Sequence, residues 1–547
     1  MAPHLLISTF DDPTTLDPHR AYESTDRHPV LNMYDSLLAL DTDGTVRPAV
    51  GAELPTIVER GAERWVTIPV RDGVRFHDGS RLTPDDVVYS LRRGIITATS
   101  HGVLWSDALL GRQLGEIGPA DAAEMLARVQ PTGEGVLLRL ARPFAPLPAL
   151  LVQWSLVVSR QWCARRGEWD GDPASAARYL HPVRTALDAE VNGTGPYTLD
   201  SWDPAERRLT FRRHPGYWAD PPQAATVTLR SEDDRIRRED QLLCGDSDFS
   251  VCQPESRDRL GELRDIVLET LPDEWCITPL GYLTQRLDPG CPAVGTGDFG
   301  QDGIRPDAFT DVHLRRALTL CFDHDRYTRE VLDGASLDHR VPFPAGVLPA
   351  DRASRPVYDP AAATRELGLA WGGAVAERGC RIVIYTHKAN ISRTRAAELL
   401  RDGLVALSPK IRVEIAEVDL ATLVGLVNAR QAPVAWSGWA GDFLHPYAFV
   451  SALVDPRGPL PIALGIDDPR LATLSEAVRD GIGDPASNYR EIAELVRTEA
   501  LYLCPPGKVS YMTYRRRWTG VRLKNQVPNV LDFASFRLRP GSESSPP

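Results

Sequence analysis

Short strand-like and helix-like segments alternate along the whole chain, and this pattern restricts the possible fold more than any other feature. Leu5–Phe10 and Trp65–Val70 are rich in β-forming residues, whereas Val30–Leu40 carries apolar residues at helical spacing. Ile391–Leu407 is amphipathic with a helical period, and Arg412–Ile415 follows it as a strand. Such alternation predicts a mixed α/β protein.

One segment gives a detailed local prediction. Val74–Ser80 is expected to be a strand that ends in an Asp-Gly turn. Thr83 can then cap a helix, and Pro84 suits the first helical position because the N–H that it lacks would be unpaired there anyway. Asp85 and Asp86 complement the positive end of the helix dipole, so a helix is predicted to begin at this point.

Glycine and proline mark a second ordered region. Asn192–Tyr197 is expected to form a tight loop that leads into a β-hairpin made of Thr198–Trp202 and Leu209–Arg213. Further on, Asp311–Cys321 is predicted to be a helix, and Asp323–Gly334 another with the glycine as its C-cap.

Length and charge limit the partners. The 547 residues suggest several units, and 62 basic against 74 acidic residues give a formal net charge of −12. An acidic surface repels phosphate backbones, so nucleic acid is not an expected partner. We find no internal repeat and no long low-complexity linker, which favours closely joined units.

Membrane insertion is not predicted, because a spanning helix needs about 20 consecutive apolar residues. The most apolar stretch, Phe144–Val158, contains Pro146 and Pro148 and is expected to form a buried helix. The first residues show no basic region followed by an apolar segment of signal length, so no export signal is predicted in this sequence.

No motif indicates a metal, a cofactor or catalysis. The eight cysteines form no CxxC pair or zinc-type spacing, and free, mostly buried thiols are favoured over disulfides. HExxH, GxSxG and Walker A motifs are absent. Gly295–Gly300 fits GxGxxG but follows Asp288–Pro292 rather than a strand, so it is interpreted as an inserted loop. We therefore expect no metal or cofactor and no enzymatic activity.

Five groups of motifs, in their order along the chain, resemble the family 5 extracellular solute-binding proteins, which are the peptide-binding subunits of oligopeptide and dipeptide ABC importers. The motifs are Pro13–His19; Val74–Ser80 with Leu82–Val87; Gly193–Tyr197 with His214–Trp218; Val312–Leu318 with Phe322 and Asp323; and Gly438–Asp442. Together they extend over most of the sequence, which makes the resemblance specific.

This resemblance implies a two-lobed periplasmic-binding-protein fold of the large peptide-binding type, whose lobes close on a ligand. The first lobe is expected to comprise residues 1–274 and 505–547, with an extra subdomain at about 50–180, and the second lobe residues 275–504. The chain is expected to cross between lobes near Trp275–Leu283 and again near Tyr502–Val509. Most motif residues are expected to shape the fold rather than contact a ligand. These are Phe76, Gly79, Gly193, Gly195, Pro196 and Tyr197.

The resemblance also implies ligand-binding residues. Asp442 lies where peptide binders of this family place an aspartate against the ligand's α-amino group, and Trp436 and Trp439 are expected to supply apolar walls. The loop of Tyr22, Glu23 and Ser24 is expected to present backbone groups to an extended ligand. For a ligand carboxylate the candidates are His387, Lys388 and Arg393. After Asp442, the segment Phe443–Tyr447 is more apolar and aromatic than is common in the family, which favours a hydrophobic or modified peptide, or an amine-bearing natural product.

The predicted function is therefore capture of a peptide or amine-bearing small molecule and its delivery to ABC permease subunits by a monomeric protein. The resemblance implies an extracytoplasmic location, periplasmic or associated with the cell surface. Because no signal peptide is predicted, a cytoplasmic location stays open. The alternative is a leaderless relative that acts as a small-molecule sensor or that has been repurposed as a biosynthetic enzyme.

Overall fold

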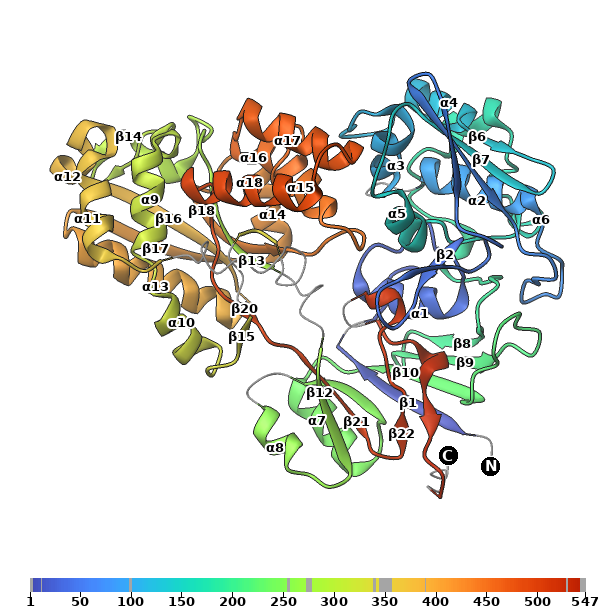
Figure 1. Cartoon of the computed structure of the whole chain (residues 1–547). Helices are drawn as coiled ribbons and strands as arrows, with labels where there is room; N and C mark the ends of the chain where they lie inside the picture. The colour runs from blue at the N-terminus through green and yellow to red at the C-terminus, as the bar shows by residue number, and fades with distance from the viewer. Residues whose placement is uncertain are drawn as a thin grey trace. The chain divides into compact units, whose positions relative to one another are not determined.

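The computed structural model divides the chain into two compact units (Figure 1). Unit 1 comprises Met1–Leu271, Asp442–Leu444 and Ser510–Pro547, and unit 2 comprises Pro272–Gly441 and His445–Val509. The structure describes residues 3–10, 12–97, 101–252, 256–271, 278–337, 341–343, 357–388, 390–527 and 530–541. Part of the expected first crossing, residues 275–277, and the tail residues 542–547 lie outside this description.

Unit 1 is built on a seven-stranded mixed sheet with the order β12-β21-β11-β1-β10-β9-β8. Strand β1 runs parallel to β10 and β11, and the other neighbouring strands are antiparallel. Because β21 comes from the end of the chain, the C-terminal segment completes this sheet. The strands are β1 His4–Thr9, β8 Tyr197–Asp203, β9 Arg208–Arg213, β10 Thr226–Ser231, β11 Phe249–Cys252, β12 Ile266–Thr270 and β21 Tyr511–Arg515.

A second, antiparallel sheet of unit 1 has the order β4-β5-β7-β6. It falls inside the range predicted for an extra subdomain, and helix α2 packs on β6 and β7. The strands are β4 Thr56–Arg60, β5 Glu63–Pro69, β6 Val129–Pro131 and β7 Gly135–Leu140. The helices of this region are α2 Pro84–Thr97, α3 His101–Leu110, α4 Pro119–Ala127, α5 Leu147–Trp154 and α6 Arg160–Arg165.

Smaller elements complete unit 1. They are α1 Ser24–Met33, α7 Arg235–Cys244, α8 Arg257–Gly261, the β2–β3 ribbon of Leu38–Leu40 and Val46–Pro48, and the β22–β23 pair of Trp518–Thr519 and Arg537–Leu538.

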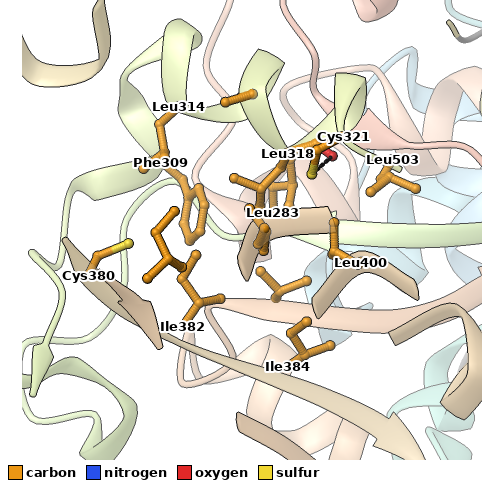
Figure 2. Close-up of a cluster of buried hydrophobic side chains, with 14 of the residues drawn as sticks. Leu283, Phe309, Leu314, Leu318, Cys321, Cys380, Ile382, Ile384, Leu400 and Leu503 are labelled. Atoms are coloured by element: carbon orange, nitrogen blue, oxygen red, sulfur yellow. Dashed lines mark hydrogen bonds between the residues drawn. The ribbon is translucent and has the colours of Figure 1, made fainter. Parts of the chain in front are cut away.

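Unit 2 has a five-stranded sheet with the order β17-β16-β18-β13-β19. Strand β16 is parallel to β17 and β18, and β13 is antiparallel to its two neighbours. Side chains from β13, β16 and the helices α9 (Val312–Leu320) and α13 (Ile391–Leu407) meet in a buried core that includes Leu283, Leu318, Ile384 and Leu400 (Figure 2). The strands are β13 Thr278–Leu283, β16 Cys380–His387, β17 Ile411–Val418, β18 Val434–Trp439 and β19 Tyr502–Leu503.

The helices of unit 2 are α9 Val312–Leu320, α10 His324–Val331, α11 Pro360–Leu369, α12 Ala374–Arg378, α13 Ile391–Leu407, α14 Leu420–Asn428, α15 Tyr447–Leu453, α16 Pro459–Leu464, α17 Pro469–Asp480 and α18 Pro485–Thr498. Its remaining strands are β14 Gly295–Gly300, β15 Ser336–Leu337 and β20 Gly507–Lys508.

Several local predictions are confirmed. Helix α2 begins at Pro84, and Thr83 caps it: the Thr83 hydroxyl accepts a 3.4 Å hydrogen bond from the Asp86 backbone N–H, and the Thr83 N–H donates a 3.0 Å bond to the Asp86 carboxylate. The hairpin of β8 and β9 follows the glycine-rich loop, and α13 has the predicted bounds. In α9, Asp311 accepts a hydrogen bond from the backbone N–H of Leu314 and so caps the helix.

Four predictions were wrong. The helix expected to end with Gly334 as its C-cap is α10, which ends at Val331 with Leu332 as the C-cap residue. The helix expected over Val30–Leu40 starts earlier and ends at Met33, because Tyr34 adopts an extended conformation and the following residues lead into β2. Val74–Ser80 forms no strand; its backbone closes on itself, with the Phe76 N–H bonded to the Ser80 carbonyl. Gly295–Gly300 is not a loop but strand β14, since it folds back and its Thr296 N–H bonds to the Asp302 carbonyl.

The motifs of unit 1 converge in space, which explains their structural role. The carbonyl of Gly195 accepts hydrogen bonds from rings of two different motifs, His77 Nε2 and His214 Nδ1, each at 3.2 Å. A Cβ at Gly195 would lie 2.5 Å from the Met33 carbonyl carbon, and one at Gly193 would lie 2.0 Å from the Met33 oxygen. Only glycine lets the loop approach α1 this closely.

Candidate functional site

Asp442, the residue predicted to bind a ligand's amino group, forms hydrogen bonds with two aromatic side chains of unit 1. The hydroxyl of Tyr22 donates a hydrogen bond to Asp442 Oδ1. The indole Nε1 of Trp154 donates a 2.8 Å hydrogen bond to the Asp442 main-chain carbonyl. These bonds fix both the backbone and the carboxylate of Asp442, while Oδ2 makes no hydrogen bond to any residue that the structure describes.

Two helix ends of unit 1 position these aromatic rings. Tyr22 lies just before α1, and Trp154 is the last residue of α5. Their rings stack with centroids 6.1 Å apart and an interplanar angle of 14°. An aromatic wall therefore adjoins Asp442.

A cation, Arg27, stacks on the ring of Trp154. Its guanidinium carbon is 4.2 Å from the centroid of the Trp154 ring, and Nη2 donates a 2.7 Å hydrogen bond to Gln153 Oε1. Gln153 in turn donates a 3.2 Å hydrogen bond to the Asn525 carbonyl, which ties this arrangement to the C-terminal segment. Arg27 is only 6% exposed.

Burial governs the protonation of this site. It raises the pKa of the Asp442 carboxyl to about 6, although the hydrogen bond from Tyr22 and the charge of Arg27 act in the opposite direction. Burial and the nearby Asp442 charge also raise the pKa of Tyr22 well above its ordinary value, so the hydroxyl keeps its proton and remains the donor. Tyr22 as a whole is 37% exposed, although its ring stacks on Trp154.

These groups can bind a cation, but they do not form a metal or nucleophilic centre. Within the described residues, no group of three or more His, Cys, Asp or Glu side chains is placed to hold a metal ion.

No helix among those residues is long and apolar enough to cross a membrane. Cys163, Cys291, Cys321, Cys380 and Cys504 are buried free thiols, and Cys244 is an exposed one.

The other predicted residues near the start of the chain occupy different environments. Glu23 is exposed at the N-cap of α1, without a side-chain cap bond, and Ser24 is the half-buried first residue of that helix.

In unit 2, Trp436 is 1% exposed and packs on Phe322 within the hydrophobic core. Trp439, at the end of β18, is half-buried, and its indole nitrogen has no hydrogen-bond partner among the described residues.

The three basic candidates also belong to unit 2. His387 is the half-buried last residue of β16, and Lys388 follows it in an exposed turn. Arg393 lies in the first turn of α13 and is half-buried. Burial lowers the pKa of Arg393, with Tyr282 and Tyr327 acting in the opposite direction. In the part of the chain that the structure describes, no carboxylate forms an ion pair with Arg393.

Sequence reasoning did not find Arg27 or Trp154. The available signal was weak. Trp154 lies in the apolar stretch that was predicted to be a buried helix. Arg27 becomes a candidate only once it is known to be buried, because a buried arginine needs a partner. The segment Phe443–Tyr447 was expected to make a pocket edge apolar, but Phe443 and Tyr447 are 2% and 1% exposed and pack inside the protein.

Comparison with known proteins decides the family. The sequence profile of "Bacterial extracellular solute-binding proteins, family 5 Middle" matches residues 58–459, most of the chain. The chain belongs to this family. Family 5 solute-binding proteins are binding proteins of ABC importers. The resemblance that the ordered motifs indicated is therefore confirmed.

Relatives of this family 5 chain include Protein XP55 of Streptomyces lividans, with 29% identity over 70% of this chain and 60% of that protein. The match thus spans less than two thirds of XP55. The probable D,D-dipeptide-binding periplasmic protein DdpA of Escherichia coli is 22% identical over 82% of this chain and 76% of its own length.

Solved structures confirm the fold of this family 5 member. The substrate-binding protein CtaP of Listeria monocytogenes gives a TM-score of 0.76 at 15% identity, covering 98% of this chain and 99% of that one. Helicobacter pylori DppA in complex with the peptide STSA gives 0.73 at 16% identity, covering 98% of both chains. The chain therefore has the two-lobed α/β fold of periplasmic peptide-binding proteins.

Proposed function

We propose that this family 5 protein binds a peptide or peptide-like ligand through a free amino group and delivers it to an ABC permease, without chemistry of its own. The observation that carries the proposal is the environment of Asp442. Its carboxylate is oriented by Tyr22, it adjoins an aromatic wall, and Oδ2 is free to accept a hydrogen bond within the described structure. A charge-assisted bond from an ammonium group to this oxygen would offset the desolvation of the carboxylate.

Arg393 is the stronger of the proposed carboxylate partners in unit 2. It is half-buried and lacks an ion pair among the described residues, whereas the exposed side chain of Lys388 has the ordinary environment of a solvated lysine. His387 is retained as a weaker candidate because it ends β16 near the start of α13. A planar guanidinium also suits a carboxylate better than an ammonium does.

The proposed partners and location follow from family membership. Relatives and structural neighbours include proteins named for dipeptide or peptide binding, which supports a peptide-like ligand here. We propose a monomeric, extracytoplasmic protein that presents its ligand-bound form to permease subunits. A ligand would favour that form only through its different contacts with the two conformations.

A thermal-shift screen of the full chain against pools of di- to hexapeptides, with amine-bearing metabolites alongside, tests the proposal. A ligand that binds only the folded protein stabilises it by about 2.7 kcal/mol at a concentration of 100 times Kd, so binding raises the melting temperature. We expect free-amine peptides to raise it and their N-acetylated forms to raise it much less. A shift confined to compounds without an amino group would contradict the proposal.

A further inference from the structure

Arg27 is a buried cation close to Asp442. If the site bound only an ammonium group, the presence of this cation would have no explanation. Its side chain is 6% exposed, and in the described portion of the chain no carboxylate comes within ion-pair distance. Nη2 bonds only to the neutral Gln153, at 2.7 Å to its amide oxygen and 3.4 Å to its carbonyl. Nε is buried and has no hydrogen-bond partner among the described residues.

Packing alone does not account for this arrangement. Removing a charge from water is unfavourable unless an opposite charge and hydrogen bonds compensate for the lost hydration. Stacking on Trp154 offsets only part of that cost. The same kind of stack exists between Arg60 and Trp65, at 3.9 Å, but Arg60 is exposed and solvated, so it needs no ionic partner.

Arg27 and Asp442 contact the same indole. The guanidinium covers the ring of Trp154, and the indole nitrogen donates to the Asp442 carbonyl. Each charge acts on the other, since Arg27 favours the ionised form of Asp442 and Asp442 favours that of Arg27. The site is therefore a pair of opposite charges, and a ligand that brought only an ammonium group would place a second cation near Arg27.

We propose that Arg27 and Asp442 together recognise a zwitterionic head group, in which one carbon carries both an ammonium and a carboxylate, as in the γ-linked glutamyl group of a peptide-like ligand. Asp442 would bind the ammonium, and Arg27 would bind the carboxylate with the donors that are still free. This inference rests on the proposed function and narrows its ligand class. An ordinary peptide amino terminus lacks this carboxylate and would leave Arg27 unpaired.

Two probes that differ only in this carboxylate test the inference. γ-Glutamyl-leucine carries the zwitterionic head, whereas γ-aminobutyryl-leucine has the same chain and ammonium but no α-carboxylate. In isothermal titration calorimetry on the full chain, we expect γ-glutamyl-leucine to bind at least tenfold more tightly. Arg27→Gln should reduce this ratio to near one, and Arg27→Lys should keep part of it.

Arg60→Gln is the matched control, because it also removes an arginine stacked on tryptophan but should leave the ratio unchanged. Circular dichroism of each variant confirms folding. The inference is overturned if the wild type binds both probes equally, a result that needs no variant, or if the ratio survives Arg27→Gln. In those cases free-amine peptides would still bind, and the proposed function would stand. Absence of binding by both probes and by every free-amine peptide would remove the proposed function as well.

Discussion

The hydroxyl of Tyr22 donates a hydrogen bond to the carboxylate of Asp442, across 420 positions of sequence. The bond connects the loop before α1 with the three-residue segment Asp442–Leu444 that belongs to unit 1. It orients one carboxylate oxygen and leaves the other for a ligand. The predictions that concern binding follow from this relationship.

Binding of an amine-bearing ligand should depend on pH. The carboxyl of Asp442 has a pKa of about 6, and only its ionised form attracts an ammonium group. Affinity should therefore rise from pH 5 to pH 7 with a midpoint near 6, measured by calorimetry with the peptide that gives the largest thermal shift. The Asp442→Asn variant should bind weakly at all these values; a wild-type affinity that is constant with pH would contradict the assignment.

Tyr22→Phe should move this midpoint upward. The hydrogen bond from Tyr22 lowers the pKa of Asp442, and a bond to a charged group contributes about 1.5–3 kcal/mol, so its loss should shift the midpoint by about one to two pH units. The aromatic stack on Trp154 is retained in this variant. Tyr514→Phe removes a comparable tyrosine–carboxylate bond, to Glu269, and should leave the midpoint where it is.

The buried ion pair of Asp17 and Arg93 should contribute strongly to the stability of unit 1. Both side chains are 0% exposed, and they form two hydrogen bonds of 2.7 and 2.8 Å. Arg93→Met should reduce the free energy of unfolding by about 3–5 kcal/mol, because it leaves a carboxylate buried and unpaired. Denaturation with urea measures this loss, and a change below about 1 kcal/mol would contradict it.

The acid response of Asp17 has a definite sign. Burial alone would raise its pKa, but the charge and hydrogen bonds of Arg93 lower it well below the ordinary value. Its stabilising contribution is therefore present above the unfolded-state pKa and is lost as pH falls through the folded-state value.

Gly195→Ala should destabilise unit 1 by about 1–3 kcal/mol, the usual cost of overpacking, because the added Cβ would lie 2.5 Å from the Met33 carbonyl carbon. Gly425→Ala is the control. It lies inside α14 with open space around the added Cβ, and should stabilise the protein by about 0.4–1 kcal/mol. Melting temperatures compare the two; equal effects would show that close approach is not what requires glycine at position 195.

Much of the fold was predictable because its signals are local. The cap at Thr83, the Asp-Gly turn and the proline after Gly195 act through neighbouring residues, and so the start of α2 and the β8–β9 hairpin could be recognised. The end of α1 could not, since Tyr34, Leu37 and Leu38 continue the apolar spacing of the helix and are all 0% exposed outside it. Apolar spacing alone does not distinguish a helix from a buried loop.

The site was predictable only where a motif marks it. Asp442 could be selected through the resemblance, but its neighbours Arg27 and Trp154 are brought to it by tertiary contacts between α1, α5 and a distant loop. Trp436 was expected to form a pocket wall because it shortly precedes Asp442 in the sequence. The structure instead places its side chain in the hydrophobic core of unit 2.

The most direct test of the account compares one peptide in its free-amine and N-acetylated forms, by calorimetry at pH 7.5, on the wild type and on Asp442→Ala. The account predicts that Asp442→Ala weakens binding of the free-amine form at least tenfold, which corresponds to about 1.4 kcal/mol, and changes binding of the acetylated form little. Equal losses for both forms would show that Asp442 does not contact the amino group, and would contradict the central claim.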